Sequence, residues 1–125
     1  MFNFSGEKPS NLGVKDGKLA ACPGSPNCVN SQSGSGKAAI EPLPNVSIAE
    51  IKQVVTGMER TTVIEETDTY LYAEFKSKLM GFVDDVEFYR DPTANVVHVR
   101  SASRLGQSDA GVNRKRVEEI RSKLS

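Results

Sequence analysis

The residues best suited to chemistry form a polar set in the C-terminal half of the chain. They are Asp84, Asp85, Arg100, Ser101, Ser103, Arg104, Ser108, Asp109, Asn113 and Arg114. Carboxylates, hydroxyls and arginines together can hold a small anion or a polar substrate. A carboxylate that leans into a core also needs such partners, because unpaired burial costs several kcal/mol. We take these residues as candidate binding residues.

Most of this set is expected to form one connected network. Strand alternation places Asp84, Ser101 and Ser103 on a helix-facing side. A short turn would then bring the last helix beside them. The expected members are Asp84, Ser101, Ser103, Arg104, Asp109, Asn113 and Arg114. Polar clusters at the edge of a small domain are mainly structural, so binding is expected to be a secondary role of this network.

Cys22 and Cys28 are the cysteines of the chain, and five residues separate them. Zinc ligands are usually spaced more closely and number four, and His98 is the sole histidine, so no metal is expected. A local disulfide and two free thiols both fit the spacing. In either state, the prolines between the cysteines should bring the two Cα atoms within about 7 Å.

Two partial catalytic motifs are weak. Gly106–Ala110 has the context of a nucleophile elbow, but His98 precedes Ser108, against the chain order of that fold. A strand-to-helix turn with Ser108 or Asp109 as the helix N-cap fits better. The segment 34–37 lacks two of the residues that define a phosphate loop.

The catalytic inventory therefore favours a binding or scaffold module that needs no cofactor. The expected ligand is a small anion near the Cys-Pro loop and the start of the last helix. A protein partner is a further expectation. The alternative is a small hydrolase or lyase that uses Asp84 or Asp85 with Ser103 and Arg104. An open cleft with a carboxylate of raised pKa would distinguish the enzyme, whereas a scaffold would saturate these groups internally.

Hydrophobic periodicity indicates the elements that position these residues. Apolar residues at helical spacing, with Ser47 and Glu50 as a capping box, predict a helix over 47–58. A second amphipathic helix is predicted over 109–124. Between them, residues 61–76 and 82–104 alternate as two hairpins. The predicted cross-strand pairs are Ile64 with Leu71, Thr62 with Ala73, Phe88 with Val97, Val86 with Val99, Glu87 with His98, and Asp85 with Arg100.

These elements predict the α+β class, with a four-stranded antiparallel meander, two helices on one face and a long irregular N-terminal segment. Residues 1–18 are expected to be a flexible segment, and residues 19–125 a single α+β domain. Sixteen basic and sixteen acidic residues among 125 argue against a nucleic-acid binder. The apolar runs are too short for a membrane span. Without an export signal the chain is expected to be cytoplasmic, or lumenal or periplasmic if it is a processed form.

Several segments carry a family resemblance. Residues 22–32, Cys-Pro-Gly-Ser-Pro-Asn-Cys-Val-Asn-Ser-Gln, resemble the Cys-Pro-x-Ser-Pro-Asn-Cys-Val-Ser-Ser-Gln signature of a family catalogued as domain of unknown function 1499. Residues 82–88 resemble its central strand, and residues 99–106 and 108–116 its closing segment. Asn30 stands where Ser is usual, and residues 33–36 are Ser and Gly where the family tends to be acidic. The resemblance implies one compact domain and assigns no activity.

Overall fold

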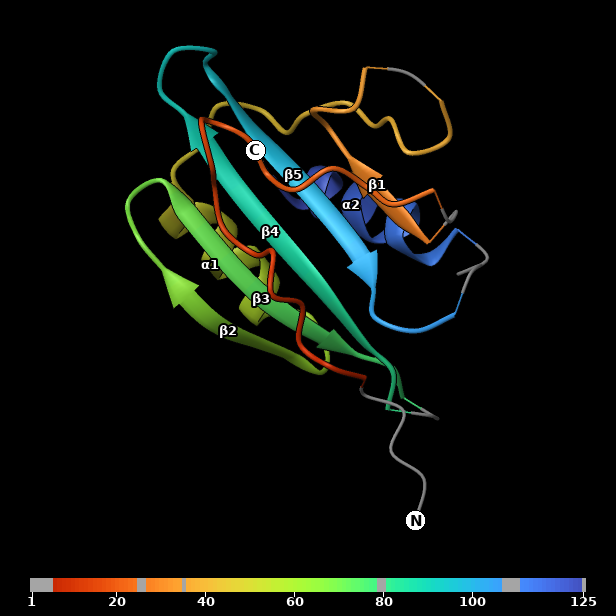
Figure 1. Ribbon diagram of the computed structural model, residues 1–125. Helices are drawn as coiled ribbons and strands as arrows, with labels where there is room; N and C mark the ends of the chain where they lie inside the picture. Colours follow the sequence, from red (N-terminus) through yellow and green to blue (C-terminus); the bar gives the residue numbers. More distant parts are fainter. Residues whose placement is uncertain (1–5, 25–26, 35, 79–80, 107–110, 125) are drawn as a thin grey trace.

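A computed structural model describes residues 6–24, 27–34, 36–78, 81–106 and 111–124. Within these residues, five strands form one antiparallel sheet in the order β1-β5-β4-β3-β2. The strands are β1 (Cys28–Asn30), β2 (Thr61–Glu66), β3 (Tyr70–Lys76), β4 (Val83–Asp91) and β5 (Val96–Ser103). Helices α1 (Ile48–Thr56) and α2 (Val112–Lys123) pack side by side on one face of the sheet (Figure 1). No helix in the described ranges has the length and apolar character to cross a membrane.

The predicted α+β class is confirmed, but the sheet has one strand more than the predicted meander. The additional strand, β1, lies in the segment expected to be irregular and pairs antiparallel with β5. With three residues it is too short to show alternation, and Pro23, Gly24 and Pro26 before it indicate turns. The sequence therefore gives no alternation that would predict β1, and the turn residues of the Cys-Pro loop favour an irregular segment there.

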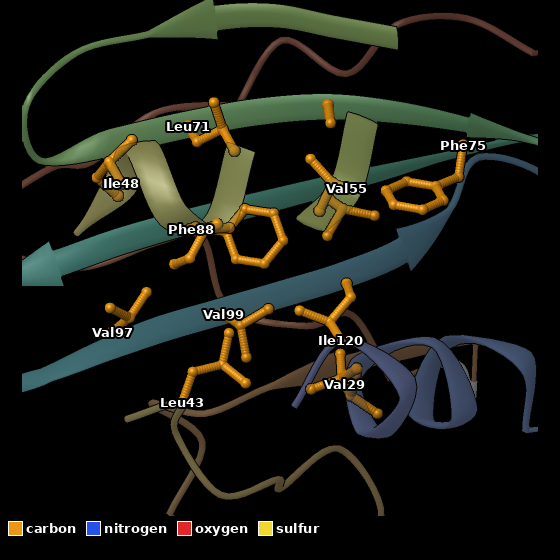
Figure 2. Close-up of a cluster of buried hydrophobic side chains, with 14 of the residues drawn as sticks. Val29, Leu43, Ile48, Val55, Leu71, Phe75, Phe88, Val97, Val99 and Ile120 are labelled. Carbon is orange, nitrogen blue, oxygen red and sulfur yellow. The ribbon is translucent and has the colours of Figure 1, made fainter. Parts of the chain in front are cut away.

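Helix α1 forms where its apolar spacing predicts. The Ser47 Oγ accepts a hydrogen bond from the Glu50 backbone N–H at 3.1 Å, which caps the first turn. The helix ends at Thr56, two residues before the predicted end. Ile48, Ile51 and Val55 are buried in the main core cluster. Figure 2 shows Ile48 and Val55 facing the sheet beside Leu71 and Phe88.

The register predicted for the second hairpin is wrong by two residues, although the two faces are assigned correctly. Phe88 pairs with Val99, and Glu87 pairs with Arg100 rather than with His98. Strand β4 continues through Asp91, so the four-residue loop lies one residue further along the chain than expected. The loop closes at Asn95, whose φ of 56° is a left-handed conformation that Asn tolerates better than most residues.

The corrected register also moves the other predicted pairs. Strand alternation is conserved when a register shifts by two, so the apolar residues stay on the helix side. The observed pairs are Val86 with Ser101, Asp85 with Ala102, and Asp84 with Ser103.

The register of the first hairpin is also wrong, because the turn lies one residue later than predicted and β2 contains a bulge between Val63 and Glu65. The strands are joined at residues 67–70, where the Thr67 N–H donates to the Tyr70 carbonyl at 2.8 Å. The observed pairs are Thr61 with Phe75, Thr62 with Glu74, Val63 with Ala73, Glu65 with Tyr72 and Glu66 with Leu71. As a result Val63 packs against the core, whereas Ile64 is 42% exposed.

Helix α2 begins at Val112, later than predicted, after Gly111 with a φ of 80°. That left-handed conformation suits glycine. Gly111 thus holds the N-cap position expected for Ser108 or Asp109, both of which lie outside the described residues. Val117 and Ile120 are buried and Leu124 is partly buried, as the amphipathic spacing predicts.

The sheet face opposite the helices is covered by the chain that precedes β1. In Figure 1 this segment, red to orange, runs across that face. Leu19 is buried with Tyr70 and Tyr72, and Leu12 and Val14 pack against the same cluster. The first six residues of β4 are consequently buried, so both faces of this strand are out of water.

The bulge in β2 predicts different costs for two neighbouring substitutions. Val63→Ser removes a side chain packed on the core and should lower the free energy of unfolding by roughly 1 kcal/mol. Ile64→Ser, on the exposed bulge residue, should change it by less than about 0.5 kcal/mol. Urea denaturation of both variants measures this difference. Equal losses, or a larger loss for Ile64→Ser, would contradict the register described for β2.

Candidate functional site

A polar network joins the sheet to α2 on the helix side. Asp84 Oδ2 accepts a hydrogen bond from Arg116 at 2.8 Å, and both side chains are largely buried. Arg116 also donates to Asn113 at 2.8 Å and to Ser101 at 3.2 Å. Asn113 accepts from Ser101 at 2.6 Å and donates to Ser103 at 2.9 Å. The network thus connects residues from β4, β5 and α2.

This arrangement confirms part of the predicted network and corrects the rest. Asp84, Ser101, Ser103 and Asn113 are connected, but the arginine that joins them is Arg116. Arg114 points elsewhere and donates to the carbonyls of Lys37 and Ala39 at 2.7 and 2.8 Å. Two residues on a helix differ by about 200° in direction, so Arg114 and Arg116 lie on different faces.

The remaining predicted members of the network are Arg104 and Asp109. Arg104 lies on the opposite face of the sheet, among Tyr72, Glu74 and Asp85. Asp109, together with the candidate binding residue Ser108, lies outside the described residues.

The Cys-Pro loop reaches the same end of the sheet as the start of α2, as the sequence predicts. Cys22 and Cys28 form a disulfide with their Cα atoms 5.7 Å apart, which confirms their predicted proximity. Asn27, at the end of the loop, donates to the Gly106 carbonyl at 2.6 Å. The Asn27 carbonyl accepts from Asn113 at 3.1 Å. The loop is therefore fixed to both β5 and α2.

Beside this network lies a groove with a volume of about 1020 Å³, which we call the α2 groove. It is bounded by the end of α1 and the chain that follows it, the end of β3, the start of β4, the end of β5 and helix α2. Apolar side chains in its lining include Met58, Phe75, Phe82, Leu105 and Val112. The size lies at the upper end of sites that bind small molecules.

The lining of the α2 groove is positively charged. Five basic residues, Arg60, Lys76, Lys115, Arg116 and Lys123, meet three acidic ones, Glu59, Asp84 and Glu119. Arg60 pairs with Glu59, Arg116 with Asp84, and Lys123 with Glu119. Lys76 and Lys115 are exposed, and their ammonium groups form no ion pair within the described part of the chain.

A second polar cluster lies on the opposite face, under the N-terminal segment. Arg104 donates to Asp85 through two nitrogens, each at 2.9 Å, and to Glu74 at 2.8 Å. Tyr72 donates to Asp85 at 2.5 Å. The hydrogen bonds to Asp85 raise the pKa of Arg104, while burial raises that of Tyr72. These groups therefore stay protonated, and the cluster is a closed ion-pair network.

Glu87, fully buried beside this cluster, is a carboxylate that sequence analysis did not select as a site residue. Its Oε2 accepts from Tyr70 at 2.5 Å and from the Gly13 N–H at 2.7 Å. Arg100 lies opposite it in the register, yet Glu87 Oε1 and Arg100 Nε are buried and make no hydrogen bond within the described residues. Burial raises the pKa of Glu87 and lowers that of Arg100.

The structure separates the groups of the hydrolase or lyase alternative. Asp84 and Ser103 lie on the helix side, whereas Asp85 and Arg104 lie on the covered side. The Asp84 and Asp85 carboxylates are both bound by arginines. His98 Nδ1 lies 3.1 Å from Ser31 Oγ, and burial lowers its pKa. The two aspartates of this alternative are therefore saturated by internal ion pairs.

The Asp84–Arg116 pair predicts a large cost when one partner is removed. Asp84→Ala leaves a largely buried arginine without its carboxylate, and should lower the free energy of unfolding by about 3 kcal/mol. Glu118→Ala, which breaks the exposed pair with Arg121, is the control and should cost less than about 1 kcal/mol. Chemical denaturation reports both values, and similar losses in the two variants would reject the structural role of Asp84.

The raised pKa of Glu87 predicts a pH dependence of stability. The native state favours the protonated carboxyl, so this group's contribution to the free energy of unfolding falls as pH rises from its ordinary pKa through its native pKa. Glu87→Gln should remove that decline. The difference in stability, wild type minus variant, should therefore decrease as pH rises above the ordinary carboxyl pKa of about 4.

Urea unfolding across this pH series measures the Glu87 effect, with exposed Glu118→Gln as the control. A difference that rises with pH would indicate that Glu87 has a lowered native pKa, and would overturn the assignment.

The chain matches the model of one known protein family. A family model described as protein of unknown function (DUF1499) matches residues 18–124. Searches of the curated proteins and of the solved structures found no significant match. The matched range contains the cysteine pair, the whole sheet and both helices. The chain therefore belongs to the DUF1499 family of proteins of unknown function.

Proposed function

We propose that the chain is a non-catalytic binding module whose α2 groove binds a small anionic ligand. The observation that carries the proposal is that two ammonium groups in the lining, those of Lys76 and Lys115, have no ion-pair partner among the described residues, in a groove with excess positive charge. An ammonium group without an internal partner is available to an anion that enters the groove.

The pairing of Asp84 with Arg116 supports the same function. A bare carboxylate in the lining would repel an anion, but Arg116 neutralises Asp84 at 2.8 Å. Arg116 also lies over the ring of Phe75, with 4.8 Å between the guanidinium carbon and the ring centroid. The guanidinium is therefore occupied on both its polar edge and its flat face, and the lysines remain to attract the ligand.

The rigid walls of the groove favour binding over chemistry. Asn113 and Ser103 hold α2 to the end of β5, and Asn27 holds the Cys-Pro loop to both. Each of the three carboxylates in the lining, Glu59, Asp84 and Glu119, forms an ion pair with a basic side chain. A preformed site whose carboxylates are ion-paired can bind a ligand without reacting with it.

An NMR titration with sodium acetate and sodium phosphate tests the proposal. Backbone amide signals of residues 103–106 and 112–116 should shift with saturation, and the affinity should fall as NaCl is added. The variant Lys76→Gln/Lys115→Gln should bind roughly fivefold more weakly, because two charges are lost. Exposed Lys37→Gln, outside the groove, should bind like wild type. Shifts spread over the whole surface, or equal affinities in all variants, would refute the site.

A further inference from the structure

We infer that the ligand of the α2 groove is an amphiphile, a medium-chain hydrocarbon with a single carboxylate head group. The inference rests on the proposed anion-binding function and specifies what else the ligand must carry. A simple anion would need only the lysines, whereas the groove also presents apolar surface to solvent. That surface requires an explanation of its own, since exposed apolar patches on soluble domains mark binding sites.

Exposed hydrophobic side chains concentrate in this groove. In the described ranges, four large hydrophobic residues are exposed: Ile64, Phe82, Leu105 and Val112. Three of them, Phe82 at 39%, Leu105 at 42% and Val112 at 45%, belong to its lining. Phe82 lies just before β4, Leu105 just after β5, and Val112 at the start of α2, so three separate parts of the chain converge on one apolar surface.

The apolar surface and the free charges belong to the same cavity. Lys115 lies three residues after Val112 on α2, and such residues are neighbours on a helix surface. Lys76 ends β3, and its neighbour Phe75 also lines the groove. A ligand that satisfies both features has a hydrocarbon part on Leu105 and Val112 and an anionic part within reach of an ammonium group.

The nature of the free cations indicates the head group. Both arginines in the lining already bind carboxylates, so no guanidinium fork is left for a bidentate oxyanion. A lysine ammonium is a point charge that needs no planar partner. A single compact anionic centre, such as a carboxylate, matches this arrangement.

The concave shape favours a monomeric amphiphile over a membrane surface. The three exposed side chains line a groove of about 1020 Å³ between packed elements. A flexible hydrocarbon chain can enter such a groove, whereas a planar bilayer contacts residues that protrude. Sites of this kind bury most of a bound small molecule.

Isothermal titration calorimetry with acetate, butanoate, hexanoate and octanoate tests the inference. Each methylene that reaches the apolar lining should tighten binding by about fourfold. The heat capacity change should become more negative along the series, because more apolar surface is buried. Octyltrimethylammonium, with a similar chain length and the opposite charge, should bind at least tenfold more weakly than octanoate.

Variants separate the two parts of the site. Leu105→Ser/Val112→Ser should abolish the gain in affinity with chain length, because the apolar contacts of the longer chains are lost. Ile64→Ser, equally exposed but outside the groove, should behave like wild type. Lys76→Gln/Lys115→Gln should weaken every carboxylate by a similar factor. Circular dichroism melting of each variant verifies that the fold is retained.

The possible failures are distinguishable. If acetate binds at the groove and octanoate binds no tighter, the amphiphile inference is overturned while the anion-binding function stands. If no carboxylate binds there, both fail. If the protein sediments with anionic phospholipid vesicles but does not bind monomeric octanoate, the occupant is a membrane and the inference is wrong. Equal binding of octanoate and octyltrimethylammonium would overturn the choice of head group.

Discussion

Strand β4 carries three carboxylates within four positions, and both of its faces are buried over that stretch. Alternation sends Asp84 to the helix side and sends Asp85 and Glu87 to the opposite side. A buried carboxylate is tolerated only when it has a charged or hydrogen-bonding partner, so each face of the sheet must supply partners for the carboxylates on that face. Arg116 meets this need from α2, and Arg104 meets it from the chain just after β5. The placement of α2 and the covering of the second face by the N-terminal segment both follow from this requirement.

The same requirement determines which cations remain for a ligand. Arg104 and Arg116 form internal ion pairs with the buried aspartates. Arg114 and Arg121 donate to backbone carbonyls of residues 37–42. The lysines at the rim of the α2 groove are left. Glu87 and Arg100 are the exception within the covered cluster, because each keeps one buried atom without a protein partner. Such atoms are typical positions for an ordered internal water.

Sequence patterns predicted the secondary-structure elements and their buried faces better than they predicted which residues pair across strands. The alternation of apolar and polar residues in β4 and β5 identifies the side of the sheet that faces the core, but it does not determine the register. The register depends on where the loop closes, and the loop closes at Asn95, one residue later than predicted. The bulge at Ile64 leaves no clear mark in the sequence. Arg116 could have been selected from the sequence, because it shares one helical face with Asn113, Val117 and Ile120. The tyrosines at 70, 72 and 89, with Leu12, Val14 and Leu19, were the signal for the second covered face.

The two outer strands of the sheet have a consequence for how copies of the chain meet. One edge is β1, three residues long and joined to the Cys-Pro loop by the disulfide. The other edge is β2, whose bulge interrupts the regular row of backbone donors and acceptors. A neighbouring molecule that approached either side would find no long, flat ladder to extend. The two edge strands thus disfavour edge-to-edge polymerisation, and the strands in the middle of the sheet keep their regular hydrogen bonding.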